Sequence, residues 1–320
     1  MHASSLIDPA GGSAPLPATA APAVPAAAND GPLPLLSTPT ASPYPAARAL
    51  RMTPKEQQEE MRRRELRRVL GLVLAPVLGL LLFGLVWHWI AVAGGQLPTP
   101  AKVWASAVDV FSDPFYRNGP NDQGIGWNVL SSLQRVAIGF GLAAAVAIPL
   151  GFVIGRFAFA GRMADPLISL LKPVSPLAWL PIGLLMFKAA NPAAIWTIFI
   201  CSLWPMLVNT AVGVRQVPQE YLNVAKVLNL SEWKVFTRIL FPAALPYVLT
   251  GVRLSVGVAW LVIVAAEMLT GGVGIGFWVW DEWNNLNVPH IIIAIFVIGI
   301  VGLLLELGLV FVARRFEYTK

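Results

Sequence analysis

Long apolar runs recur through this chain, and they restrict its fold more than any other feature. Residues 69–93 and 127–155 form two of them, each longer than the roughly 20 residues that a helix needs to cross the hydrocarbon core of a bilayer. Hydrophobic residues make up 56% of the chain and charged residues 12%, which is too apolar a balance for a soluble domain of this size. The sequence therefore predicts an all-α integral membrane protein.

Four further spans bring the predicted number to six, at 167–187, 193–214, 245–266 and 291–313. With six crossings both termini lie on the same side. Most Lys and Arg residues outside the spans fall on that side, and the exceptions are Lys102, Arg117 and Lys188. Basic residues concentrate on cytoplasmic segments. We therefore expect cytoplasmic termini, and the net charge of +6 reflects this topology rather than binding of nucleic acid.

The region before the first span divides into two parts. Residues 1–47 are rich in Pro and Ala, lack any helical or strand period, and are predicted to be disordered. Residues 48–68 are highly charged and are predicted to form a helix at the cytoplasmic membrane surface. The predicted organisation is thus an arm at 1–68 followed by a transmembrane domain at 69–320.

A moderately polar island, residues 217–246, separates the fourth and fifth predicted spans. Its first helix is predicted at 219–228, with Pro218 at the start, where a missing N–H costs least, and Glu220 in the first turn. Asn229 suits a left-handed residue after that helix, because Asn tolerates positive φ better than most residues.

A second helix of the island is predicted at 232–240, with Ser231 as its cap and Pro242 and Pro246 closing the unit. One face of this helix is apolar, because its members recur at helical spacing. They are Trp233, Phe236 and Leu240. The island is therefore predicted to be a helix-turn-helix with an apolar face.

This island resembles the cytoplasmic loop of the permease subunits of bacterial ATP-binding-cassette (ABC) importers. That loop has the pattern Glu-Ala-Ala, then Gly, then Ile-x-Leu-Pro at fixed spacings. The matching positions here are Asn223, Val224, Ala225, Asn229, Ile239, Phe241 and Pro242. Asn223 departs from the pattern by losing a carboxylate, and Asn229 by replacing the glycine. The alternative interpretation is an ordinary amphipathic loop.

The resemblance implies a coupling helix that sits in a groove of a separate ATPase subunit. The residues it assigns to that contact are Glu220, Asn223, Ala225, Asn229, Trp233, Ile239, Phe241 and Pro242. It implies the six-helix fold of type I importer permeases in a bacterial inner membrane. It also implies three partners, namely the ATPase, a periplasmic or lipid-anchored binding protein and a second permease copy. No Walker loop, HExxH or Cys/His metal spacing occurs in the chain, so we expect no enzymatic site, no metal and no cofactor here, with ATP on the partner.

Charged residues inside the spans are candidates for the transport pathway. Arg253 and Glu306 lie at the same depth in the fifth and sixth spans, so an ion pair between them is the favoured interpretation, and attraction of an anionic substrate by Arg253 is the alternative. Glu267 follows the fifth span and is a weaker candidate, because a carboxylate repels anions.

Two glycine-containing patterns have simpler interpretations than a ligand site. Small residues recur every fourth position in the second span, which favours close helix packing. They are Gly139, Ala143, Ala147, Gly151 and Gly155. The glycine cluster at 271–276 follows no strand and lacks the GxGxxG spacing, so it indicates a flexible external segment rather than a nucleotide site.

The resemblance to importer permeases covers about 126–315 and is strongest within the nitrate, sulfonate, taurine and bicarbonate group. The stretch TGVRLSVGVAWLVIVAAEMLTGGVGIGFWVWDEWN is similar to nitrate permeases in particular. Nitrate, together with nitrite, is therefore the leading substrate that the resemblance implies. Sulfonate, taurine and bicarbonate are the alternatives within the group. A secondary transporter is the alternative from another class, but the chain shows neither inverted repeats nor many intramembrane carboxylates.

Overall fold

The computed structural model describes residues 53–95 and 97–316. Within these residues every regular element is a helix, and the isolated pairing of Arg117 with Gln123 is the one β-bridge found there. The predicted all-α class is confirmed. The predicted Pro/Ala-rich arm at 1–47 lies outside the described residues.

The chain divides into two compact units, 1–75 and 76–320. Helix α2 (Pro54–Gly94) is continuous over 41 residues, so the charged segment and the first predicted span share one helix. Glu, Gln, Lys, Arg and Leu dominate its first part, and all of them are good helix formers. The separation of an arm at 1–68 and its place at a membrane surface stay predictions.

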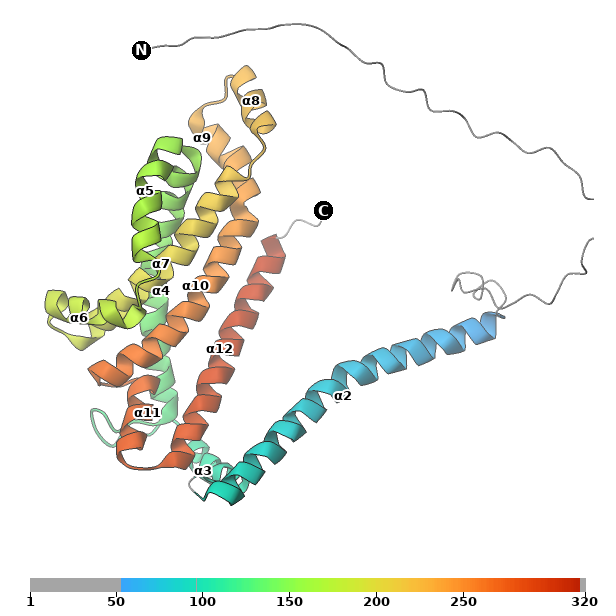
Figure 1. Ribbon diagram of the computed structural model, residues 1–320, viewed down its shortest axis with the longest axis vertical. Coiled ribbons are helices and arrows are strands. Elements are labelled where there is room, and N and C mark those ends of the chain that lie inside the picture. Colours follow the sequence, from blue (N-terminus) through green and yellow to red (C-terminus); the bar gives the residue numbers. More distant parts are fainter. Residues whose placement is uncertain (1–52, 96, 317–320) are drawn as a thin grey trace, which may run out of the picture. The chain divides into compact units, whose positions relative to one another are not determined.

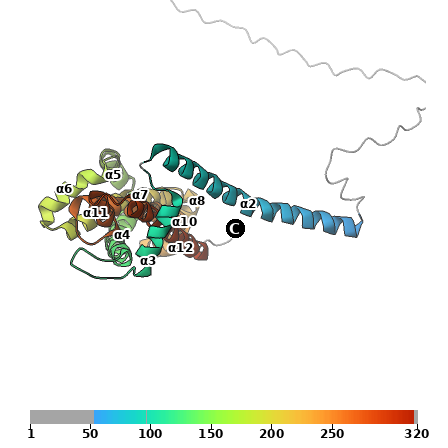
Figure 2. The same cartoon turned by 90° about the horizontal axis from the view of Figure 1, so that it is seen from below.

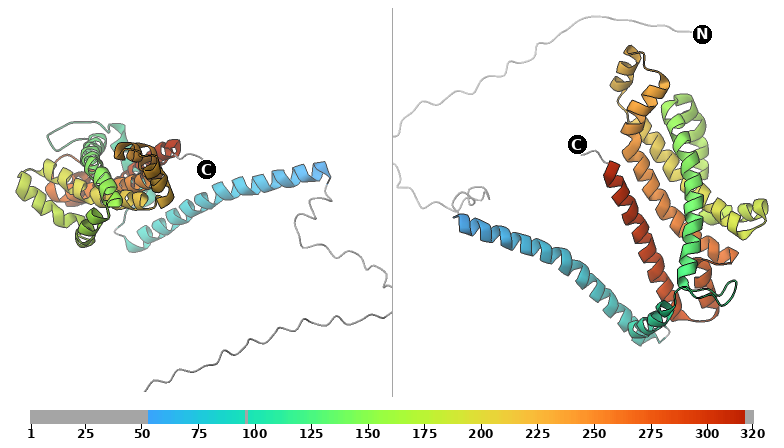
Figure 3. Two further views of the ribbon diagram at one scale, coloured as in Figure 1. Left: turned by 90° about the horizontal axis from the view of Figure 1, so that it is seen from above. Right: turned by 180° about the vertical axis from the view of Figure 1, so that it is seen from behind.

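Three long helices form the centre of the second unit. They are α4 (Ile125–Arg156), α7 (Ala190–Arg215) and α10 (Phe241–Thr270). Each contacts the other two, and Figures 1 and 3 show them side by side, with α12 (Val288–Phe316) against α10. The fully buried side chains between them include Ile198 and Ile263. This packed core fixes the positions of the segments at both ends.

The small-residue stripe of α4 faces α7. A Cβ added to Gly139 would lie 2.8 Å from the side chain of Ile198, and one added to Gly151 would lie 2.6 Å from that of Thr210. These distances leave no room for a side chain, so the two helix backbones approach closely at these glycines. The predicted packing role of the stripe is confirmed.

The third predicted span, 167–187, is a pair of helices. Helices α5 (Ala158–Leu171) and α6 (Pro176–Phe187) meet at 98°. Pro173 lies in the break and Pro176 begins the second helix, which are the places where a residue without an N–H interrupts or starts a helix. Pro173 and Pro176 therefore account for the break, and the pair begins well before the predicted span.

Five helices in the described part of the chain are long and apolar enough to cross a membrane, or six if the bent pair counts as one span. This agrees with the six predicted spans. The span that contains α10 runs from Glu232 to Thr270, 39 residues in all, and so begins well before the predicted start at residue 245.

Short helices lie at both ends of this bundle (Figure 1). At one end are α8 (Gln219–Val227) and α9 (Glu232–Val235), and a π-helical segment, η1 (Phe236–Leu240), joins α9 to α10. At the other end, which Figure 2 views directly, are α3 (Pro100–Ser112) and α11 (Ile275–Asn284).

Helices α3 and α11 lie between predicted spans, in segments for which no helix was predicted. Thr99 precedes α3 with extended backbone and Pro100 is its first residue, which is a recognised helix start. α3 packs against α12, while α11 packs against α4, α10 and α12. The glycine-rich segment before α11 is therefore attached to the bundle rather than flexible.

Candidate functional site

The first half of the polar island is α8 and the turn that ends it. The N–H of Leu230 donates to the carbonyl of Ala225, and that of Asn229 to the carbonyl of Lys226, each at 3.0 Å. These two bonds form a Schellman motif, which requires a left-handed residue. Asn229 supplies it with φ of +47°, as predicted.

The second half begins at Ser231. Its backbone is extended and its carbonyl accepts a bond from the N–H of Val235 at 2.9 Å, but its side chain makes no capping bond. The helix start predicted there is therefore confirmed, while the side-chain cap is absent.

The prediction that Pro242 and Pro246 close the unit is wrong. Both lie inside the continuous helical run that begins at Glu232. At η1 the N–H of Phe241 donates to the carbonyl of Phe236, five residues earlier. This wider turn breaks the regular i to i−4 ladder just where Pro242 lacks a donor. The second helix of the island consequently continues without a break into α10.

The inner face of the island packs on the bundle through one apolar cluster. Ala225 is 2% exposed within it, and the ring of Phe152 on α4 packs against those of Phe236 and Phe241 at 5.0 and 6.0 Å. Arg156 at the end of α4 donates to the carboxylate of Glu232 at 3.2 Å. The island is thus fixed to α4 by packing and by an ion pair.

The outer face of the island is apolar yet exposed. Val227 is 81% exposed. Four other large apolar side chains of the island are exposed, namely Tyr221, Val224 and Leu228 on α8 and its end, and Trp233 on α9, whose ring stacks on that of Phe236. We call these five side chains the outer face of the island. Of these five, only Trp233 was predicted to contact the ATPase. The family motif gives positions along the chain, whereas the exposure of a side chain depends on which side of α8 packs against the bundle.

The predicted coupling residues divide between the two faces. Exposed ones are Glu220, Asn223, Asn229, Trp233, Phe241 and Pro242; Ala225 is buried and Ile239 is half-buried against the inner cluster. Asn223 has no carboxylate, and its side-chain oxygen accepts a bond from the amide of Gln219 at 3.4 Å. The motif positions therefore include both residues that shape the island and residues open to a partner.

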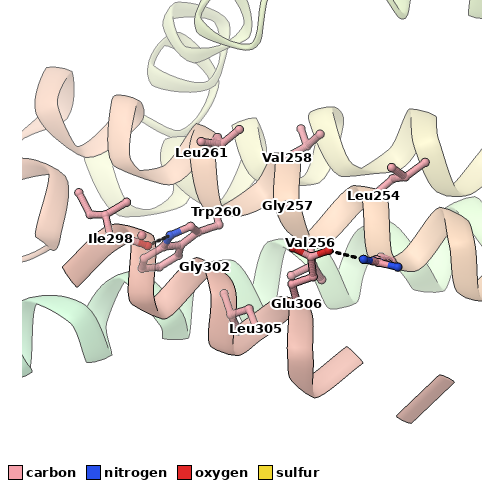
Figure 4. A pocket seen from close by; sticks show the side chains of 12 residues that line it. Leu254, Val256, Gly257, Val258, Trp260, Leu261, Ile298, Gly302, Leu305 and Glu306 are labelled. Carbon is pink, nitrogen blue, oxygen red and sulfur yellow. Dashed lines mark hydrogen bonds and ion pairs between the residues drawn. The ribbon is translucent and has the colours of Figure 1, made fainter. Parts of the chain in front are cut away.

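A cavity of about 510 Å³ lies between α10 and α12 (Figure 4). Arg253 donates to the carboxylate of Glu306 at one end of it, and Trp260 donates to the carbonyl of Ile298 at 2.9 Å near the other. The predicted ion pair is confirmed. Its two side chains are 53% and 52% exposed, so the pair is also open to whatever occupies the cavity.

Glu267 lies at the opposite end of α10 and is 1% exposed. Arg135 donates to its carboxylate at 2.5 Å, Ser132 at 2.8 Å and the N–H of Gly276 at 3.0 Å. These contacts of a buried carboxylate fit a structural role. Its place in a substrate pathway stays a prediction.

Comparison with known proteins identifies the family of this chain. Residues 147–318 match the family described as binding-protein-dependent transport system inner membrane component. The chain belongs to that family. The matched region contains the polar island and the helices that carry Arg253 and Glu306.

Two relatives are close over most of their length. The nitrate import permease protein NrtB of Synechocystis sp. is 47% identical over 235 residues, which are 73% of this chain and 86% of the relative. The bicarbonate transport system permease protein CmpB of the same organism is 46% identical over 248 residues, 76% of this chain and 89% of the relative. Both are permeases of the same class as the one predicted.

A solved structure supports the fold. A chain of the MetNI methionine ABC transporter, in an inward-facing conformation, matches with a TM-score of 0.51 and 13% identity, covering 60% of this chain and 95% of that chain. At this identity the match concerns the fold alone. It agrees with the predicted type I importer permease architecture.

Proposed function

We propose that this chain is the permease subunit of an ATP-driven ABC importer that carries nitrate, with nitrite as a second substrate, across the inner membrane. The observation that carries the proposal is the identity of 47% and 46% to the nitrate import permeases of Synechocystis and Leptolyngbya laminosa. The match extends over 86% and 82% of those relatives, so it covers nearly the whole permease.

Bicarbonate is the second candidate substrate, because the CmpB relative is 46% identical. Sulfonates and taurine are named by none of the relatives described above and rank behind both. Bicarbonate and nitrate are both small planar monoanions, so the fold alone does not separate them. Direct uptake does.

The coupling role of the polar island is part of the proposal. Its outer face exposes five large apolar side chains on one short unit that is itself anchored to α4. Large exposed apolar patches mark interaction sites. We assign this face to the ATPase subunit, which binds ATP, so the permease itself has no catalytic site.

The distribution of charge supports cytoplasmic termini. Basic residues outnumber acidic ones at the end of the bundle that carries α8. They are Arg156, Arg162, Arg215, Lys226, Lys234 and Arg238, against Asp165, Glu220 and Glu232. Acidic residues predominate on the other side, where Asp109, Asp113, Asp122, Asp281 and Glu282 compare with Lys102, Arg117 and Lys188. By the positive-inside rule the α8 end is cytoplasmic, and the binding protein delivers substrate to the other.

A second copy of the chain completes the proposed pathway. The Arg253–Glu306 pair is half exposed on a helix face that lies within the spans, and a charge facing lipid is costly. A second permease against this face would enclose the cavity between the two copies. Arg253 is then the residue in this cavity that can attract an anion.

Uptake of labelled nitrate tests the transport function. Cells that lack the chain but keep its partner subunits are compared with cells in which it is restored, with bicarbonate, sulfonate and taurine as competitors. We expect ATP-dependent nitrate accumulation that sulfonate and taurine leave unchanged. Uptake of labelled bicarbonate without nitrate uptake would show that the substrate is bicarbonate. Accumulation that persists without the ATPase would show that the protein is a secondary transporter and not an ABC importer.

Co-purification of the ATPase tests the coupling surface. Val227→Asp places a charge on the outer face of the island, and Leu286→Asp is the matched control, because both residues are 81% exposed and Leu286 lies after α11 at the opposite end of the bundle. We expect Val227→Asp to reduce ATPase recovery at least tenfold and the control to retain it. Equal recovery with both variants would overturn the coupling assignment.

A further inference from the structure

The N-terminus of α11 is capped by side chains from two other helices. The N–H of Gly274 donates to the side-chain oxygen of Asn128 at 2.9 Å, and the N–H of Ile275 donates to the hydroxyl of Ser132, also at 2.9 Å. The N–H of Gly276 donates to the carboxylate of Glu267 at 3.0 Å. The first N–H groups of a helix have no partner within it, and here α4 and α10 supply three.

Glu267 is the charged member of this cap. Its carboxylate is buried, and burying an unpaired charge is costly. The guanidinium of Arg135, at 2.5 Å, compensates it, and the hydroxyl of Ser132 adds a bond at 2.8 Å. Removing Arg135 therefore leaves the carboxylate of Glu267 buried without its cation.

Arg135 makes two further hydrogen bonds, one to the glycine-rich segment and one to α7. The same nitrogen that donates to Glu267 donates to the carbonyl of Val273 at 2.7 Å. Its Nε donates to the side-chain oxygen of Asn191, at the start of α7, at 2.6 Å. One side chain on α4 thus holds residues of α7, α10 and the segment before α11.

The glycines of this segment permit the contact. A Cβ on Gly274 would overlap the carboxylate of Glu267, and one on Gly276 would overlap the backbone carbonyl of Val264. Gly271 and Gly272 have φ of +77° and +90°, values that favour glycine. The cluster is therefore explained by close approach of backbone to a buried carboxylate.

The rest of α11 is only partly covered. Trp278 is buried and its ring stacks on that of His290 at 5.7 Å, while Trp280 and Trp283 are exposed. α11 is 10 residues long, and isolated helices of this length are not stable in water. Its position consequently depends on its attachments. The polar ones include the Arg135–Glu267 cluster and the contact of Glu282 on α11 with the imidazole of His290 on α12 at 3.1 Å.

We infer that Arg135 and Glu267 form a charge-paired latch that clamps α11 to α4 and α10, so that this end helix moves with the bundle instead of as a separate cap. The inference assigns Arg135 and Glu267 as positioning residues for transport. Its mechanical part stands independently, whereas its consequence for transport rests on the proposed function.

Hydrogen exchange tests the clamp directly in the full-length protein in lipid nanodiscs. Glu267→Gln preserves the shape and an acceptor but removes the charge, and Ser132→Ala removes one cap without changing charge. We expect amides of 274–276 to exchange at least tenfold faster in Glu267→Gln and less so in Ser132→Ala. The matched control is Glu306→Gln, which makes the same charge change in the other intramembrane ion pair and should leave these amides protected.

Protection at 274–276 that is unchanged in both Glu267→Gln and Arg135→Met would overturn the latch. Faster exchange throughout α10 in Glu267→Gln would also count against it, because that pattern is general unfolding rather than release of α11. Arg135→Lys keeps the charge, and we expect it to restore most of the protection lost in Arg135→Met.

The transport consequence is read as substrate accumulated per ATP hydrolysed by the assembled importer. We expect Glu267→Gln to lower this ratio at least fivefold while ATPase recovery and ATP turnover stay within twofold of the unmodified complex. A parallel fall in recovery, turnover and uptake would reduce the pair to a structural role and overturn the positioning assignment. Absence of nitrate uptake by the unmodified complex would contradict the proposed substrate and leave the exchange result valid.

Discussion

Arg253 on α10 and Glu306 on α12 form an ion pair between two spans, 53 residues apart in the sequence. Both side chains are also about half exposed to the cavity between these helices. On the sequence alone, an ion pair and the attraction of an anion are alternatives for Arg253. In the structure the pair joins the two helices and also exposes the guanidinium to the cavity.

The strength of this pair is measurable by a double-mutant cycle. We expect Arg253→Met and Glu306→Gln each to lower the melting temperature of the solubilised protein, because each leaves an unpaired charge within the spans. The double variant should recover part of the loss, with a coupling free energy of about 1 kcal/mol. Strictly additive losses would show that the pair contributes no net interaction.

The turn at Asn229 predicts a contrast between two substitutions. Asn229→Val puts a β-branched residue at φ of +47° and should destabilise the island by about 1 to 2 kcal/mol. Asn229→Gly should cost nothing or stabilise slightly, because glycine adopts this conformation freely. Limited proteolysis of the loop compares them, with Asn223→Val on the exposed side of α8 as the control. Equal cleavage of the Asn229→Val and Asn229→Gly variants would contradict the strained turn.

Close packing of α4 on α7 predicts opposite effects at two nearby glycines. Gly139→Ala places a methyl 2.8 Å from the side chain of Ile198, whereas a methyl at Gly141 meets nothing within 4 Å. The first should destabilise by about 1 to 3 kcal/mol. The second should stabilise by up to about 1 kcal/mol through helix propensity. Thermal unfolding of the solubilised variants distinguishes them, and shifts of the same sign would contradict the close contact.

Because Ala225 is buried, a substitution there tests the packing of the island and not only its contact with the ATPase. An Ala225→Arg change would place a charge in the inner cluster and disrupt the island itself, so loss of ATPase binding would not isolate the docking contact. Ala225→Leu should cost about 1 to 3 kcal/mol by overpacking, while Val224→Leu on the exposed side should stay within about 0.5 kcal/mol. Amide exchange over 219–230 measures both. Equal exchange in the two variants would place Ala225 outside the packed face.

The parts of the fold that follow from local patterns were predictable from the sequence. Apolar length indicated the number of spans but not where the third and fifth begin. Asn after a short helix indicated the left-handed turn, and equal depth paired Arg253 with Glu306. Each of these inferences uses spacing along the chain or a conformational preference of one residue type. The outcome agrees with the structure because local preference and global packing favour the same arrangement there.

Features that depend on tertiary contacts were missed. Arg135 and Glu267 are 132 residues apart, and Arg135 lies in a span without any spacing that links it to α10. Pro242 indicates a helix end by its own chemistry, but the π-helical turn before it accommodates the missing donor. The outer face of the island follows only when the packing side of α8 is known. In each case the deciding partner is remote in sequence.

The unbroken run from Glu232 to Thr270 gives these distant features a mechanical relation. At 1.5 Å per residue, its 39 residues form a rod about 58 Å long. It has the polar island at one end and the buried carboxylate of Glu267 at the other. A tilt of about 5° at the island therefore displaces the far end by about 5 Å, so the rod works as a lever that enlarges a small rotation. The π-helical segment within the island, η1, is where such a lever would flex.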